Sequence, residues 1–220
     1  SVRAITPTKQ LVIGKSPDMT NLDYQEAIDQ IRYYERTLSL SEIDILYNED
    51  KPRVPIYVNI NATGANDGTS WTDAYTSLDA AITASTSANE IWVAIGTYKP
   101  AETVRTATFS LKNGLKMYGG FNGTETLLSE RNPNLNVTVL SGDINGNDNS
   151  NISSAETTRQ DNSYHVLTVK GNLRDIVIDG FTISGGNANG PTLTSGVASA
   201  QYYHTRGGAI YINPYISGDA

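Results

Sequence analysis

Short apolar runs that recur along the chain constrain its fold more than any other feature of the sequence. Runs that begin at residues 91, 115, 137 and 165 are each long enough for one strand, and turns rich in Gly, Asn and Asp separate them. Their starts lie about 20–28 residues apart, with no long helical pattern between them. This spacing is typical of a solenoid, in which each repeat buries its inner face against its neighbours.

A sandwich of antiparallel hairpins is the competing architecture. Two-residue turns that join strands of equal length are scarce in the sequence. The one candidate, Asp179-Gly180, joins two runs of only about three residues each and fits a corner between strands better than a hairpin. We therefore predict an all-β chain whose residues 56–220 form the N-terminal coils of a parallel β-helix, right-handed by the crossover rule for parallel strands.

An amphipathic pattern over residues 70–82 predicts a helix that caps the first coil. Ser70 and Asp73 have the spacing of a capping box at its start. Apolar residues then recur at helical spacing: Trp71, Ala74, Tyr75, Leu78, Ala81 and Ile82. A strand is expected from Ile91 to Ile95, followed by a turn at Gly96. An uncapped first coil would expose apolar side chains and strand edges, which explains why a cap is expected there.

The first 50 residues have a different pattern. We expect strands at 11–14 and 26–34, then a short helix within 38–47 that begins at Ser39 with Glu42 three residues on. This segment resembles the C-terminal end of laminin-G-like, concanavalin-type jelly-roll domains, through residues 13–14, 27–34, 36–39, 42–43 and 46–47. The resemblance implies that 1–50 is the final part of such a sandwich, with the proline-containing segment 51–55 as a linker.

Residues 56–220 resemble secreted bacterial β-helix proteins that are pectate-lyase-like in fold and frequent in Bacteroidota. The matching segments are residues 62–71, 90–98, 118–125, 130–132, 140–149, 162–168, 179–190 and 206–211. The resemblance implies secretion or display on the cell surface, often within long multidomain adhesin-like proteins. It implies no single activity.

Composition excludes several classes of function. The formal charge is −7 and no Lys/Arg cluster is present, which argues against binding to nucleic acid or to an anionic membrane surface. The chain has no cysteine, which excludes disulfides and thiol chemistry. No apolar run approaches the ~20 residues that a membrane-spanning helix needs. The chain begins without Met and stops just after a strand signal, so we expect it to be an internal piece of a longer protein.

One loop has the composition of a calcium site. Asp143, Asn145 and Asn147 follow the D-x-N-x-N opening of calcium-binding loops, and Asp148 adds a second carboxylate. The pattern then departs from that motif, because Asp148 stands where Gly is expected and Ser154 stands at the twelfth position in place of Glu. The alternative is a turn in which the Asn and Asp side chains bond their own backbone.

Aromatic residues supply the candidates for a sugar-binding surface. Trp92 is expected to point outward from its strand, where it is either covered by the cap region or exposed. Tyr202 and Tyr203 lie in a long polar segment between coils, where solenoids often contact partners. No catalytic residue is assigned. His165 is expected to be a packed side chain within a strand, and neither it nor His204 has the spacing of a catalytic triad or a metal site.

These patterns favour a non-catalytic part of a large secreted or cell-surface bacterial protein that acts in adhesion or carbohydrate binding. The expected partners are glycans, host or cell-surface molecules, and secretion or anchoring machinery. Two alternatives stay open. One is a polysaccharide lyase or hydrolase of the β-helix class whose catalytic coils lie beyond Ala220, and the other is a structural spacer.

Overall fold

The computed structural model describes residues 32–48, 52–100, 103–171, 173–190 and 204–213. The chain divides into two compact units, residues 1–43 and residues 44–220. The strands expected at 11–14 and 26–34 lie outside the described residues, and so does most of the proposed jelly-roll segment.

Helix α1 (Leu40–Asn48) begins where the sequence predicts. The Ser39 backbone N–H donates to the Glu42 carboxylate over 2.9 Å, and the Glu42 N–H donates to Ser39 Oγ over 3.3 Å. These two reciprocal bonds form a capping box and confirm this prediction. Arg36 pairs with Glu42 at 2.5 Å. The bond from Arg36, with those from Ser39, lowers the pKa of Glu42 to about 2.

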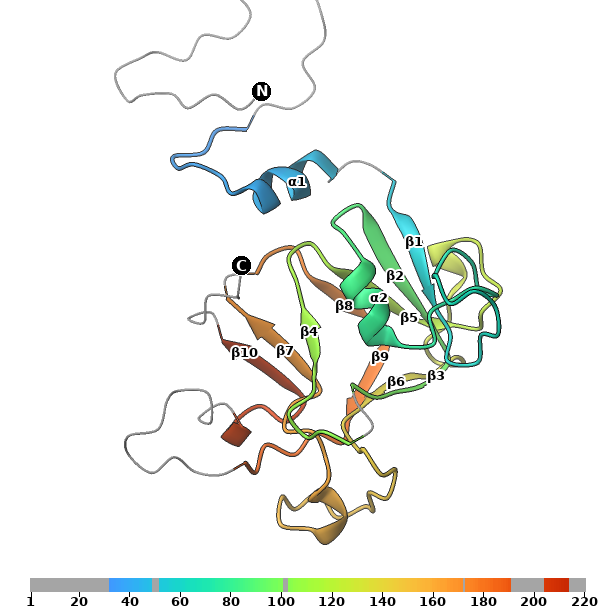
Figure 1. Cartoon of the computed structure of the whole chain (residues 1–220), viewed down its shortest axis with the longest axis vertical. Helices are drawn as coiled ribbons and strands as arrows, with labels where there is room; N and C mark the ends of the chain where they lie inside the picture. The colour runs from blue at the N-terminus through green and yellow to red at the C-terminus, as the bar shows by residue number, and fades with distance from the viewer. Residues whose placement is uncertain (1–31, 49–51, 101–102, 172, 191–203, 214–220) are drawn as a thin grey trace, which may run out of the picture. The chain divides into compact units, whose positions relative to one another are not determined.

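The described residues of the second unit form three parallel sheets together with short helices (Figure 1). The strands are β1 (Val54–Val58), β2 (Asn89–Ala94), β3 (Gly96–Tyr98), β4 (Phe109–Leu111), β5 (Lys116–Phe121), β6 (Thr138–Ser141), β7 (Leu167–Lys170), β8 (Val177–Asp179), β9 (Phe181–Ser184) and β10 (Ile210–Asn213). They pair in the orders β1-β2-β5-β8, β3-β6-β9 and β10-β7-β4. Two short 3₁₀ helices, η1 (Leu128–Glu130) and η2 (Thr157–Arg159), lie in the connections.

From β2 onward, consecutive strands enter the three sheets in the same cyclic order. Strands β2–β4 therefore form a first three-strand repeat, β5–β7 a second and β8–β10 a third. All strand pairings among the described residues are parallel. The prediction of stacked parallel strands is thus confirmed for these residues, and the antiparallel hairpin alternative is not observed in them. Connections within a repeat range from a single residue, Ile95 between β2 and β3 or Gly180 between β8 and β9, to the long segment 142–166 between β6 and β7.

The predicted helix over residues 70–82 is wrong in its first half. Helix α2 (Leu78–Ala84) starts after Ser77, whose Oγ accepts the Ala80 N–H over 3.3 Å. Ser70 and Asp73 do bond each other, with Asp73 N–H to Ser70 Oγ at 3.0 Å, but within a loop. Tyr75 forms a parallel bridge with Val58, and this pairing with β1 is incompatible with a helix through the same residue.

The core lies between the three sheets and α2. Inward-facing residues stack in register from strand to strand, as in the row Ile56, Ile91, Met117 and Ile178 of the four-stranded sheet. Helix α2 adds its buried face, which comprises Leu78, Ala81 and Ile82. This face contributes to the main hydrophobic cluster together with Val58 and Phe109, which supports the predicted packing role of these helical residues.

Within the described residues, the structure has no helix that combines the length and the apolar character required to cross a membrane.

Candidate functional site

The loop predicted to bind calcium is closed by Asp143. Its Oδ1 accepts the backbone N–H groups of Gly146 and Asn147 over 2.7 and 3.1 Å, and its Oδ2 accepts that of Asp148 over 3.1 Å. The Asn145 N–H donates to Asp161 Oδ2 over 2.9 Å. This geometry is that of a turn in which a carboxylate satisfies backbone donors, the alternative that the sequence left open.

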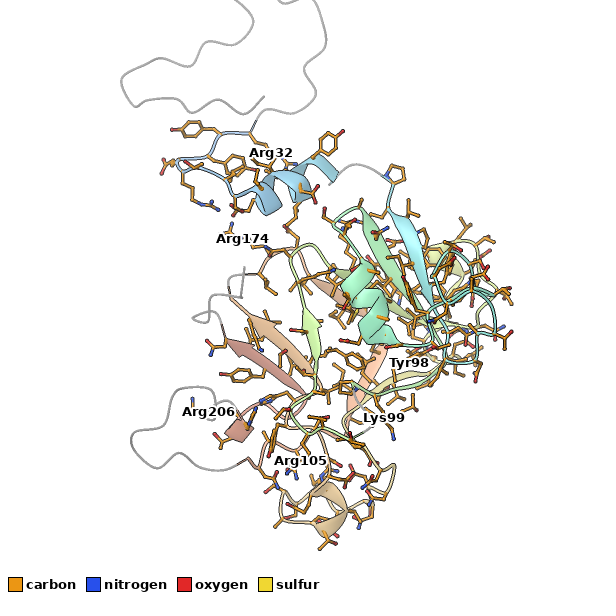
Figure 2. All side chains as sticks on the ribbon, in the orientation of Figure 1. Arg32, Tyr98, Lys99, Arg105, Arg174 and Arg206 are labelled. Carbon is orange, nitrogen blue, oxygen red and sulfur yellow. The ribbon has the colours of Figure 1, made fainter. Side chains whose placement is uncertain are left out.

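Asp148 points into a buried polar cluster. Its Oδ2 accepts Arg159 Nη1 over 2.8 Å and Asn162 Nδ2 over 2.9 Å, and Asn162 is fully buried. Arg105, labelled in Figure 2, also bonds this region, because its Nε donates to the Asn162 carbonyl oxygen over 2.7 Å. In the described part of the chain, Oδ1 of Asp148 and Oδ1 of Asn162 accept no hydrogen bond although both are buried.

The four predicted calcium ligands therefore have separate surroundings. Asp143 faces backbone amides, Asp148 faces Arg159, and the side chains of Asn145 and Asn147 are exposed. Nowhere in residues 32–48, 52–100, 103–171, 173–190 and 204–213 do three His, Asp or Glu side chains gather as a potential ligand set for a metal ion.

Trp92 lies on the outer face of its sheet, as predicted, but other rings cover it. The side chain is only 3% exposed. It stacks on Phe121 with ring centroids 4.8 Å apart and planes at 11°, and the Tyr57 ring meets it edge-on at 5.8 Å. Its Nε1 donates to Glu90 over 2.7 Å. Trp92 therefore packs within the protein and presents no open face to a sugar. Tyr202 and Tyr203 lie outside the described residues.

Trp92 belongs to a row of side chains that crosses the four-stranded sheet. Strand register places Tyr57, Trp92, Tyr118 and Asp179 side by side on β1, β2, β5 and β8. Neighbouring strands are about 4.8 Å apart, so adjacent members of the row can touch. Trp71 covers the first part of this row, packing at 4.7 Å from the Tyr57 ring.

The other end of the row is more open and carries charge. Tyr118 is half-buried, and the Arg131 guanidinium lies 5.3 Å from its ring centroid. The same guanidinium pairs with Asp179 and donates to the Gly119 carbonyl oxygen over 3.3 Å. The Asp179 side chain is 53% exposed, whereas that of Arg131 is 18% exposed. Burial, followed by the charge of Glu90, raises the pKa of Tyr118.

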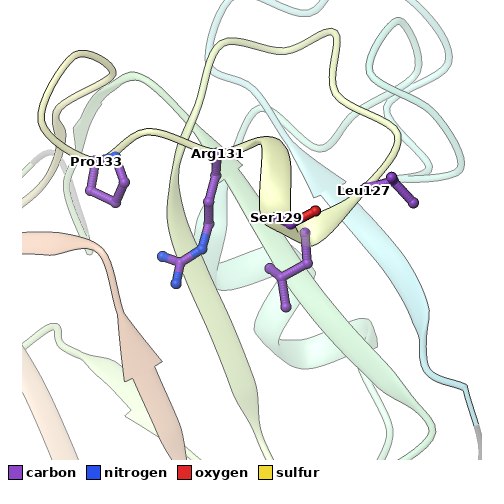
Figure 3. A pocket seen from close by; sticks show the side chains of 5 residues that line it. Leu127, Ser129, Arg131 and Pro133 are labelled. Atoms are coloured by element: carbon purple, nitrogen blue, oxygen red, sulfur yellow. The ribbon is translucent and has the colours of Figure 1, made fainter.

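A surface hollow of about 580 Å³ adjoins this charged end. Leu127, Leu128, Ser129, Arg131 and Pro133 line it. Figure 3 shows the Arg131 side chain between Pro133 on one side and Ser129 on the other. We call this hollow, together with Tyr118 and Asp179, the Arg131 site.

The loop that forms the hollow is held by two carboxylates. Glu130 accepts the backbone N–H groups of Thr126 and Leu127 over 2.8 and 3.0 Å. Glu125 accepts three further N–H groups, from residues 122–124, over 2.6–3.0 Å. The bonds from Thr126 and Leu127 lower the pKa of Glu130, so its carboxylate stays charged and keeps these bonds to a lower pH than an ordinary Glu would. The wall of the hollow is therefore preorganised.

The sequence patterns did not predict that Arg131, Tyr118 and Asp179 lie together. Tyr118 falls within the apolar run that begins at residue 115, and Asp179 falls at an expected corner between two short runs. Their proximity depends on the register between β5 and β8, and Arg131 reaches them from a connecting loop. A Gly-rich strand end followed by a charged loop is the only signal at this position, and it does not specify the contact.

The Arg131 site offers a half-buried aromatic ring, an exposed carboxylate, a guanidinium and apolar walls in one place. Such a set can bind a polar ligand that also has an apolar face. Comparison of the chain with protein-family models, with curated proteins and with solved structures found no match.

Proposed function

We propose that the chain is part of a secreted or cell-surface bacterial protein that binds carbohydrate through the Arg131 site. In this proposal, residues 56–220 are the N-terminal coils of a right-handed parallel β-helix, and residues 1–50 are the end of a laminin-G-like domain. The cyclic order in which the parallel strands enter three sheets supports the β-helix. The sequence resemblance supports secretion and surface display.

The observation that carries the binding proposal is the contact of Arg131 with both Tyr118 and Asp179 beside the hollow. Sugars present hydroxyl groups around an apolar ring face. An aromatic side chain can cover that face, while charged planar groups form hydrogen bonds with neighbouring hydroxyls. The exposed Asp179 carboxylate supplies a polar contact, and Leu127 and Pro133 of the adjoining hollow supply apolar ones.

Charge favours a neutral glycan as the ligand. Asp179 already neutralises Arg131, so a uronate or sulfate would have to compete with this ion pair. The chain as a whole carries a formal charge of −7, which repels polyanions at low salt. We therefore expect neutral hexose-containing glycans to bind more tightly than acidic ones.

A glycan array tests this proposal directly. The wild-type chain should retain neutral glycans, and Asp179→Asn or Tyr118→Ala should weaken binding about tenfold, which corresponds to the loss of one good contact. Asp79→Asn is the matched control, because this exposed carboxylate lies on α2, away from the four-stranded sheet's outer face. Wild-type binding to no glycan, or equal binding by Asp179→Asn and Asp79→Asn, would overturn the proposal.

The enzymatic alternative is separable by its products. A polysaccharide lyase would release unsaturated sugars, and a hydrolase would release reducing ends. If the protein that contains this chain released either product, an enzymatic function would be supported in place of adhesion. A pure spacer would show neither binding nor turnover.

Calcium binding at the 143–149 loop stays a second proposal, favoured by the unpartnered, buried Oδ1 atoms of Asp148 and Asn162 in the described residues. The Arg159 charge beside Asp148 opposes it. Calorimetric titration of calcium into the chain tests whether the ion binds despite the Arg159 charge. Heat of binding that disappears in Asp148→Asn would support the site, and neither heat nor a thermal shift would remove it.

A further inference from the structure

The two histidines of the chain meet at the boundary between the second and third three-strand repeats. The His165 ring stacks on Tyr211 of β10, with centroids 4.8 Å apart and planes at 24°. The His204 ring stacks on Tyr164, with centroids 4.3 Å apart and planes at 16°. The two imidazole centroids are 5.8 Å apart. Each histidine therefore joins a residue of one repeat to a residue of the next.

Backbone bonds at the same place tie β10 to β7. Val166 and Leu167 donate their N–H groups to the carbonyl oxygens of Gly208 and Ala209 over 3.1 and 3.0 Å. His165 Nδ1 lies 3.0 Å from the Gly207 carbonyl oxygen. Strand β10 has little apolar burial to support these bonds, because Ile212 is 65% exposed. The two ring stacks add side-chain contacts to the backbone pairing of β10 with β7.

Basic groups surround His204. Arg105, from the segment before β4, lies with its guanidinium carbon 4.3 Å from the Tyr164 ring centroid. It is fixed there by bonds to Asn189 Oδ1 at 2.5 Å and to the Asn162 carbonyl oxygen. Among the described residues, the charged and titratable groups around His204 include Arg105, Tyr164, His165 and Lys170, with Arg206 and Tyr211 on its own side of the junction.

We propose that His204 and His165 form a pH-sensitive junction that holds β10 on β7 at neutral pH and loosens as the pH falls into the weakly acidic range. A proton on His204 adds a positive charge to a partly buried group that already faces His165, Arg105 and Lys170. Arg105 cannot swing away to relieve the repulsion, because its bonds to the chain at 162 and 189 fix it. Moving the 204–213 segment relieves it instead.

The direction of the pH effect follows from linkage. Burial, then the charges of His165, Arg105 and Lys170, lowers the pKa of His204 from its usual 6.5. The folded junction therefore binds the proton less readily than the open one. Its contribution to stability is present above pH 6.5 and is lost as the pH falls from 6.5 through the lower pKa of the folded state.

Hydrogen exchange of the whole chain between pH 7.5 and 5.0 tests the junction. After correction for the intrinsic pH dependence of exchange, the Val166 and Leu167 amides should exchange at least about threefold faster at pH 5.0. The Ile95 amide, bonded to Phe121 in the first two repeats at 2.7 Å, is the internal reference and should show no such change. Equal changes at all three amides would overturn the proposal.

His204→Phe is the matched variant, because it keeps a ring against Tyr164 and removes the titrating group. It should abolish the excess exchange at Val166 and Leu167, and an unchanged excess would contradict the role of His204. An NMR titration of the wild-type histidines does not depend on the variant folding. One of the two imidazole signals should titrate below pH 6.5, and a His204 signal that titrates at or above 6.5 would also refute the junction.

Discussion

At the scale of single residues, Trp92 illustrates how strand alternation specifies a face of the sheet but leaves open what covers that face. The alternation correctly placed Trp92 opposite the inward-facing Ile91 and Val93. Its cover comes from Tyr57 and Phe121, which lie on other strands. Register and loop path determine such contacts, and neither is encoded in the local pattern.

Replacement of this ring should therefore affect stability and not only ligand binding. Trp92→Ala removes a buried aromatic side chain and should lower the free energy of unfolding by about 3–5 kcal/mol. Trp92→Phe keeps a ring against Phe121 but loses the bond to Glu90, so it should cost less. Urea unfolding followed by circular dichroism measures both. A loss below about 1 kcal/mol in Trp92→Ala would show that the ring is not packed as described.

At the scale of elements, the region before α2 contains the sequence signal of a helix start, but the residues that give this signal form their hydrogen bonds within a loop. The Ser70 and Asp73 pair has the spacing and the bonds of a helix start, with Asp73 N–H to Ser70 Oγ at 3.0 Å. The Asp73 carboxylate, however, also accepts the Ala65 N–H over 2.8 Å and so closes a loop. Tyr75 pairs with Val58 in a parallel bridge, so the helix cannot include Tyr75. It begins after Ser77, which caps it. Long-range pairing with β1 outweighed a local helical preference.

Two serine substitutions separate these assignments. Ser77→Ala removes the cap of α2 and should lower the free energy of unfolding by about 1 kcal/mol, with a loss of helical signal. Ser70→Ala should leave the helical signal unchanged, because its hydroxyl bonds Asp73 within the loop. Far-ultraviolet circular dichroism and thermal unfolding provide the comparison. The reverse outcome would restore the longer helix that the sequence suggested.

At the scale of the whole molecule, the spacing of apolar runs was sufficient to predict stacked parallel strands. It missed two short members of the stack. The turn predicted at Gly96 is instead the start of strand β3, Gly96–Tyr98, and Phe109–Leu111 is too short to give a pattern. Both strands exist because neighbours pair with them, β6 with the first and β7 with the second. The Arg131 site was missed for a related reason, since it joins residues of two repeats.

Glycines set how closely the second and third repeats approach at the Arg131 site. A Cβ atom on Gly119 would lie 2.5 Å from the Gly180 carbonyl oxygen and 3.0 Å from Thr138 Cβ. A Cβ atom on Gly142 would likewise lie 2.7 Å from the Gly185 carbonyl oxygen. Backbones of adjacent repeats are thus in direct contact at these positions, and any side chain would force them apart.

Gly119→Ala should therefore act on stability and on the site together. The added methyl group cannot fit against the Gly180 backbone without separating β5 from β8, at a cost of about 1–3 kcal/mol. The same separation would move Tyr118 relative to Asp179, so glycan binding should weaken even under conditions where the chain stays folded. Ser110→Ala, at an exposed position of β4, is the control and should change neither quantity. Denaturant unfolding combined with the glycan assay tests both effects, and a stable Gly119→Ala variant with wild-type binding would show that the close approach of the two repeats is not required.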